Sequence, residues 1–368
     1  MLDKTPGGVA CGHCQTLGAD ALCRYCRRPV HRGCLDSDRC QVPHPWERML
    51  GRGRRLRDID EDGAIGRVHD PFDGDQIVDL GSGTAVDAWP KMEHEGLPVQ
   101  LFSEQALGRG VLVRRAATYT FEDRSDGDSI VVYHAPLLAR ARLSAGRMEQ
   151  VELVRRPPHG FDPDRLAVAR DGRTALVSAS RFDIVDIEGK HPTRVVDLKG
   201  EMMLDLAISS ELGLAVAAMF GRLGCYDLKS GELRGSIPFA GEEVTAVVLG
   251  GGRVAAVTSE RRLVVKEVGP GAPDGWPDVL RAEVDFRGRL APGELALSHD
   301  GRLAALRHRR KQAVVVDLAS GGRQVLAGHT DKVIFVRFVA GGRVLVTADD
   351  DDRVRFWPRA GDRIVSGD

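Results

Sequence analysis

The chain has 368 residues, more than one ordinary hydrophobic core holds, which indicates either two domains or one large repeat array. Hydrophobic residues make up 42% and charged residues 29%, as in soluble globular proteins, and the formal net charge of −1 gives no overall attraction to nucleic acid or to an anionic membrane. No long apolar stretch predicts a membrane span, and the first ten residues lack the apolar core of a signal peptide. We therefore expect a cytoplasmic protein without a membrane partner. Only eight of the 52 basic residues are Lys, a composition typical of a GC-rich bacterial genome.

The N-terminal segment concentrates residues that bind metal ions. Six of the seven cysteines lie between residues 11 and 40. In a reducing compartment, paired cysteines are more often metal ligands than disulfides. Zinc takes four ligands from thiolates and imidazoles, and a two-residue gap lets one tight turn aim two ligands at one ion. Four such pairs predict two zinc ions, whose binding would supply the folding free energy of so short a segment. The pairs are Cys11 and Cys14, Cys23 and Cys26, His31 and Cys34, and Cys40 and His44.

This spacing resembles the RING-like treble-clef zinc fingers of prokaryotic proteins, over about 36 residues. The resemblance implies a cross-braced arrangement with two structural zinc ions in residues 1–46. One ion would take Cys11, Cys14, His31 and Cys34, and the other Cys23, Cys26, Cys40 and His44. The family usually ends on a cysteine where this chain has His44. An in-sequence pairing of the ligands, or a single zinc ion with the last pair unused, remains open.

Residues 47–57 are rich in arginine and glycine. We interpret this range as a basic linker between the finger and the rest of the chain. Because the overall charge is balanced and no row of aromatic residues offers a stacking platform, we expect a charged linker here and no nucleic-acid site.

The C-terminal end resembles a WD repeat, the four-stranded unit of many β-propellers. The residues that carry the resemblance are the Gly328-His329 start, Thr347, Asp351 and Trp357. In that family, a His, a Ser or Thr, an Asp and a Trp form a hydrogen-bonded chain that joins the strands of a blade. The resemblance assigns this structural network to His329, Thr347, Asp351 and Trp357. The Asp that usually follows the Trp is replaced by Pro358.

Weaker copies of the same pattern precede it at a period of about 41 residues. Asp186, Asp227 and Asp317 occupy the position after the Trp. Tight Gly-containing turns recur between short strand-like segments, as hairpins require. These turns are 171–173, 251–253, 300–302 and 341–343.

The predicted fold is therefore all-β: a WD-repeat-type β-propeller over residues 58–368 with a small N-terminal zinc finger. Five copies are visible, and residues 58–158 leave room for two more, so we expect seven blades, with six as the alternative. A strand from the start of this region would close the ring by pairing with the last blade, which removes exposed sheet edges.

The propeller range shows no catalytic constellation. Cys225 is predicted to be a buried core thiol. The basic run from Arg307 to Lys311 is interpreted as a solvated hairpin tip, with contact to an acidic partner as the alternative.

The first functional hypothesis is a protein-interaction scaffold without enzymatic activity, in which finger and propeller both bind other proteins. The alternative is a ubiquitin-ligase-like factor, in which the RING-like finger recruits a conjugating enzyme and the propeller selects the substrate. Leu17, Leu35 and Trp46 are its candidate contact residues. We expect neither nucleic acid nor a small-molecule substrate as a partner.

Overall fold

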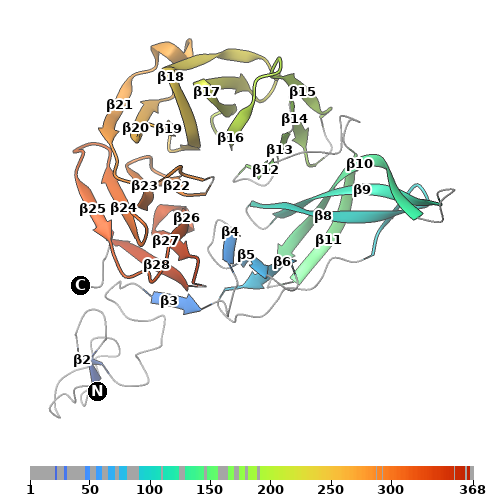
Figure 1. Cartoon of the computed structure of the whole chain (residues 1–368), viewed down its shortest axis with the longest axis horizontal. Coiled ribbons are helices and arrows are strands. Elements are labelled where there is room, and N and C mark those ends of the chain that lie inside the picture. The colour runs from blue at the N-terminus through green and yellow to red at the C-terminus, as the bar shows by residue number, and fades with distance from the viewer. Residues whose placement is uncertain are drawn as a thin grey trace.

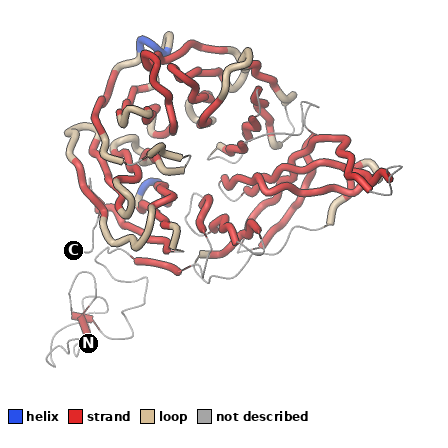
Figure 2. Tube along the Cα trace, in the orientation of Figure 1, coloured by secondary structure: helices blue, strands red, loops and turns tan. Residues whose placement is uncertain are grey.

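A computed structural model gives the fold. It describes residues 21–22, 29–30, 46–49, 55–59, 65–70, 74–80, 91–108, 111–123, 129–144, 147–155, 165–169, 174–178, 181–188, 191–286, 288–291, 293–351, 353–360 and 363–364. These residues are almost all strands and turns, with two short 3-10 segments at Pro273–Gly275 and Ala340–Gly342 (Figure 2).

The strands form antiparallel sheets that follow one another around a centre (Figure 1). The N-terminal half contributes a pair, β1 (Ala21–Leu22) with β2 (Pro29–Val30), and a three-stranded sheet of β4 (Arg55–Ile59), β5 (Ile65–Asp70) and β6 (Gly74–Asp79). A five-stranded sheet follows, with long strands that run outward from the ring: β7 (Glu93–His94), β8 (Leu97–Gly108), β9 (Val111–Asp123), β10 (Ser129–Ser144) and β11 (Arg147–Arg155).

The next sheets have the regular four-stranded form. One contains β12 (Arg165–Val168), β13 (Thr174–Ser178), β14 (Arg181–Asp186) and β15 (Arg194–Asp197). Two further sheets share long strands: β16 (Met203–Ser209), β17 (Leu214–Asp227), β18 (Leu233–Gly250), β19 (Arg253–Thr258), β20 (Arg262–Glu267) and β21 (Asp278–Glu283). The first part of β17 pairs with β16 and its second part with β18, which then continues as the inner strand of the following sheet.

The last two sheets complete the ring. They are β22 (Leu295–Leu297), β23 (Leu303–His308), β24 (Gln312–Asp317) and β25 (Arg323–Leu326), then β26 (Val333–Val339), β27 (Val344–Asp349), β28 (Arg353–Ala360) and β29 (Arg363–Ile364). The innermost strands β4, β8, β12, β16, β18, β22 and β26 contact one another in this order, and β26 contacts β4 again. The ring is therefore closed.

The closing strand comes from an unexpected place. β3 (Trp46–Met49) pairs antiparallel with β28, so that Trp46 lies opposite Phe356. The prediction that a strand from residues 58–158 closes the ring is therefore wrong, because residues 46–49 pair with the last sheet instead. The range expected to be a linker, 47–57, instead contains most of β3 and the first residues of β4. A four-residue strand is too short to show a period in the sequence.

The core consists of layers between neighbouring sheets, since side chains alternate between the two faces of each strand. On β19, Val254 and Ala256 pack toward the preceding sheet, whereas Ala255 and Val257 pack toward the following one. Because both faces are covered, the middle strands are continuously buried and do not alternate with polar residues.

Four inner strands carry a β-bulge at the same place, which bends each strand where it lines the centre of the ring. The register shifts fall between Leu56 and Asp58, Met203 and Asp205, Val244 and Ala246, and Val333 and Phe335.

Candidate functional site

The connections between strands lie on two opposite faces of the ring, because antiparallel neighbours place successive connections at alternate ends of a sheet. One face, here the turn face, carries tight turns at 210–213, 227–232, 251–252, 298–302, 317–322 and 340–343. The other, here the loop face, carries the bend at 220–221 and the connections at 240–243, 259–261, 284–294, 309–311, 327–332 and 349–352, of which residues 287, 292 and 352 are not described.

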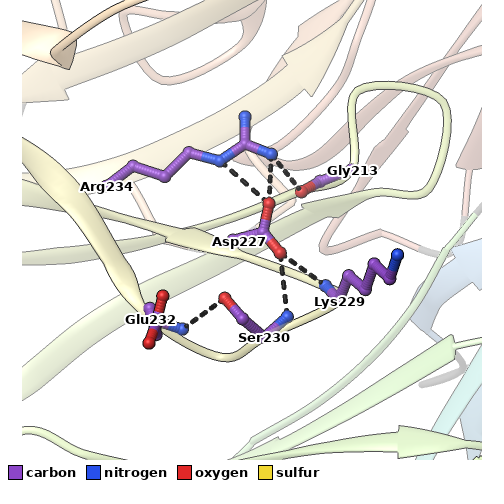
Figure 3. A network of polar contacts seen from close by, with 6 residues as sticks. All are labelled: Gly213, Asp227, Lys229, Ser230, Glu232 and Arg234. Atoms are coloured by element: carbon purple, nitrogen blue, oxygen red, sulfur yellow. Dashed lines mark hydrogen bonds and ion pairs between the residues drawn. The ribbon is translucent and has the colours of Figure 1, made fainter.

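On the turn face, the aspartates at the predicted repeat position build near-identical turns. The carboxylate of Asp227 accepts hydrogen bonds from the backbone N–H groups of Lys229 (2.9 Å) and Ser230 (2.8 Å), as Figure 3 shows. Asp317 makes the same bonds to Ala319 and Ser320, at 2.9 and 2.8 Å. A short polar side chain that pairs with amides two and three residues onward fixes a turn locally.

Arg234 adds a charge to the first of these turns. Its guanidinium donates to the Asp227 carboxylate and to the carbonyl oxygen of Gly213, which joins two turns of one sheet (Figure 3). The hydrogen bond from Arg234, followed by those from the backbone of Ser230, lowers the pKa of Asp227 to about 2. Asp227 is therefore ionised wherever the protein is folded near neutral pH.

Two glycines let neighbouring sheets meet closely on the turn face. A Cβ atom on Gly251 would lie 2.1 Å from the backbone nitrogen of Gly301, and Gly251 also has a φ of 55°. Arg253 donates to the carbonyl oxygen of Gly301 at the same contact, at 2.5 Å. At this contact the two turns therefore leave no room for a side chain on Gly251.

The loop face contains the hydrogen-bonded network of the last sheet. The Thr347 hydroxyl lies 2.7 Å from Nε2 of His329 and accepts from Nε1 of Trp357 at 2.8 Å. Nδ1 of His329 lies 2.9 Å from a carboxylate oxygen of Asp349. All four side chains are buried. Three of the residues assigned from the sequence are therefore brought together here.

Asp349 takes the place that the sequence assigned to Asp351, so that assignment was wrong. Asp349 ends β27 pointing into the sheet, and its second carboxylate oxygen accepts from the backbone of Asp351 (3.2 Å) and Arg353 (3.0 Å). Asp351 is exposed in the turn. Four consecutive aspartates make the acceptor ambiguous in the sequence, and only the register of β27 with β28 decides it.

Burial controls the charge state of this network. Desolvation lowers the pKa of His329 in spite of the adjacent Asp349 carboxylate, so the imidazole is neutral at pH 7. Burial would raise the pKa of Asp349, but hydrogen bonds from His329 and from backbone amides outweigh it and the pKa is lowered. A neutral imidazole between an acceptor and a hydroxyl fits a structural role.

A buried ion pair anchors the long connection between β21 and β22. Nε of Arg307 lies 2.9 Å from the carboxylate of Glu294, and the two residues are 2% and 1% exposed. The same carboxylate oxygen accepts from the backbone of Ala291 (2.9 Å), while Arg307 donates to the carbonyl oxygen of Arg289 (2.6 Å). Arg307 therefore belongs to the interior, and the predicted solvated tip begins after it.

Ion pairs on the loop face connect neighbouring sheets. Arg309 lies 3.0 Å from Asp285, and Arg310 lies 2.8 Å from Asp331. Backbone hydrogen bonds run alongside and tie the loops in series: Val284 to Arg261 (2.8 Å), Arg309 to Asp285 (3.1 Å), Val333 to Arg310 (2.8 Å) and Asp350 to Lys332 (2.9 Å). Further ion pairs are Arg289 with Glu243 and Arg55 with Asp350. The loop face is thus assembled from connections of several sheets that are joined to one another.

The same face exposes two large apolar side chains. Met202 is 71% and Phe220 68% exposed, the highest values for large apolar residues in the described part of the chain. Met202 precedes β16 and Phe220 lies on β17, and they adjoin the register pair Met203 and Met219, so the two residues stand opposite each other at the same end of the sheet. No sequence pattern predicts this pair, because both residues adjoin buried or half-buried positions of the same strands.

The predicted zinc ligands Cys11, Cys14, Cys23, Cys26, His31, Cys34, Cys40 and His44 lie outside the described residues. Within the described ranges, no three His, Cys, Asp or Glu side chains form a metal site. Cys225 is a buried thiol as predicted, and burial raises its pKa to about 12. Across the part of the chain with assigned structure, none of the helices is long and apolar enough to cross a membrane.

Comparison with known proteins identifies the fold. No protein-family model matches the chain, and no curated protein matches it. Among solved structures, it is similar to the β-propeller domain of Cps50 (Swd1) from Myceliophteria thermophila, with a TM-score of 0.59 and 15% sequence identity. The match covers 86% of this chain and 100% of that domain. Together with the closed ring of strands, this likeness shows that the chain folds as a β-propeller.

Proposed function

We propose that the protein is an interaction scaffold whose docking surface is the loop face. The observation that carries the proposal is the combination of a face locked by ion pairs and backbone bonds between sheets with exposed apolar and basic side chains. A rigid surface loses little conformational entropy when a partner binds. The turn face offers no comparable set of exposed apolar residues in its described part.

We further propose that the ring has seven blades. The inner strands β4, β8, β12, β16, β18, β22 and β26 follow one another around the ring, and each would belong to one blade. β3, which pairs with β28, would complete the last blade. The five-stranded sheet from β7 to β11 would be the most irregular blade.

Two structural zinc ions in the N-terminal segment remain part of the proposal. β1 and β2 pair antiparallel on either side of the sequence segment that contains Cys23 and Cys26, which supports a finger there. Metal analysis of the purified chain should find two zinc ions. A value near one would contradict the cross-braced arrangement. The ubiquitin-ligase-like alternative stays a prediction, since Leu17 and Leu35 lie outside the described residues.

Proximity labelling in the source organism tests the scaffold proposal. The wild-type chain is compared with a loop-face variant, Phe220→Asp with Arg309→Glu, and a turn-face control, Lys229→Glu with Arg343→Glu. A set of labelled proteins lost only in the loop-face variant supports the proposal. Identical sets in all three, with all three folded, would contradict it.

A further inference from the structure

Three consecutive cations stand at the turn between β23 and β24 on the loop face. Arg309, Arg310 and Lys311, here the basic tip, are all exposed. Two acids lie within ion-pair distance of the tip, Asp285 from the preceding loop and Asp331 from the following one. Positive charge therefore exceeds negative charge locally, although the whole chain carries a net charge of −1.

The basic tip and the apolar pair, Met202 with Phe220, lie on the same face of the ring, on two sheets separated by the sheet of β18 to β21. Phe220 is the strand partner of Glu243, whose carboxylate pairs with Arg289. Arg289 lies in the same connection as Asp285, which bonds to the basic tip through both its backbone and its side chain. The apolar pair is thus linked to the tip through paired residues and a single connection of the chain.

We infer that this surface is a two-part docking site for an acidic protein segment that carries an apolar side chain. The acidic residues of the segment lie over the basic tip, where they offset its excess charge. The apolar side chain covers Met202 and Phe220. This inference rests on the proposed scaffold function and names the chemistry of its partner. Burial of apolar area supplies affinity, while complementary charge supplies orientation and rate of association.

The surroundings favour a short protein segment over nucleic acid. A long polyanion that crosses the basic tip would meet the next connection along the ring, which carries Asp350 and the exposed Asp351. Nucleic acid needs a track of several phosphate contacts, each from a cation. A short acidic segment needs only the tip and the apolar pair.

Fluorescence anisotropy with a synthetic probe tests the inference on the full chain. The probe is a labelled peptide of Glu and Ser residues with one Leu, compared with a copy in which Ser replaces the Leu. A labelled single-stranded oligonucleotide is measured in parallel. Wild-type protein should bind the Leu peptide most tightly, and the affinity should fall as salt screens the exposed charges.

Matched variants separate the two parts of the site. Arg309→Gln with Arg310→Gln and Lys311→Gln should weaken binding of both peptides about tenfold at low salt. Phe220→Ser with Met202→Ser should weaken binding of the Leu peptide about fivefold and leave the other copy unchanged. The turn-face control, Lys229→Gln with Arg302→Gln and Arg343→Gln, should keep wild-type affinity. Lys311→Gln alone should weaken binding about twofold and serves as the second variant if the triple change lowers stability.

The inference is overturned if the basic-tip variants bind the peptides as tightly as wild type does. It is also overturned if the oligonucleotide binds more tightly than the peptide and loses affinity in the basic-tip variants. If the peptide fails to bind while labelled partners still depend on the loop face, only this docking chemistry is wrong. If the labelled partners do not depend on that face either, the scaffold function fails as well.

Discussion

The turn face and the loop face of the ring are stabilised by different kinds of interaction. On the turn face, backbone amides and small turns fix the geometry, as at Asp227 and at the contact of Gly251 with Gly301. On the loop face, backbone hydrogen bonds also join the connections, but side chains contribute more: Glu294 and Arg307 form a buried pair, and Arg309 and Asp285 form an exposed one. Backbone-built turns tolerate few substitutions, whereas a surface made of side chains changes its chemistry freely. This difference supports the proposal that partners dock on the loop face.

The largest expected effect concerns the buried ion pair of the loop face. Glu294→Ala should lower the free energy of unfolding by about 3–5 kcal/mol, because it leaves Arg307 buried without its acid. Urea unfolding measures this loss. Asp285→Asn, which removes an exposed pair on the same face, should unfold at nearly the same urea concentration as wild type. Similar losses for the two variants would show that the interior pair does not anchor this face.

The turn face has a corresponding weak point at Gly251. Gly251→Ala should cost about 2–4 kcal/mol, since its Cβ would collide with the backbone of Gly301 and its φ is positive. Gly252→Ala is a matched control, because Gly252 also has a positive φ but no atom within 4 Å of the position that its Cβ would take. The midpoint temperature of thermal unfolding should therefore be well below that of Gly252→Ala in the Gly251→Ala variant. Equal midpoint temperatures for the two variants would mean that the positive φ angle alone destabilises both, without any contribution from the collision with Gly301.

The hydrogen-bonded network tests which aspartate serves the last blade. Thr347→Val should cost about 2–3 kcal/mol, because it leaves the Trp357 indole N–H and the His329 ring buried without their partner. Asp349→Asn should also destabilise the fold, whereas Asp351→Asn should unfold like wild type. A larger loss for Asp351→Asn, measured by urea unfolding, would restore the sequence assignment.

The smallest expected effect is the loss of folding stability that protonation of Asp227 on the turn face causes at acid pH. The pKa of Asp227 is about 2 in the folded state against an ordinary value of 3.8. Its contribution to stability is therefore present above about pH 4 and is lost as the pH falls toward 2. Asp227→Asn should show a shallower loss of stability than wild type across this window. Unfolding curves at several pH values measure the slope, with Asp351→Asn as the control that keeps it.

The local repeat determined much of the fold. The period of about 41 residues, the recurrent Asp and Gly turns and the final His329, Thr347 and Trp357 pattern predict a β-propeller, because each feature acts within one blade. Cys225 was likewise predictable as a buried thiol, since it lies in an apolar strand. The proposed zinc ligands were assigned by the same local reasoning.

Tertiary structure decided the features that join distant segments. Only the pairing of β3 with β28 shows that residues 46–49 close the ring, because a four-residue strand gains its stability from its neighbour and carries no period of its own. Only strand register selects Asp349 over Asp351, and only packing places Arg307 inside while Arg309 stays outside. The exposed pair of Met202 and Phe220 is of the same kind, since a sequence encodes apolar character but not which apolar side chain the neighbouring blade leaves uncovered.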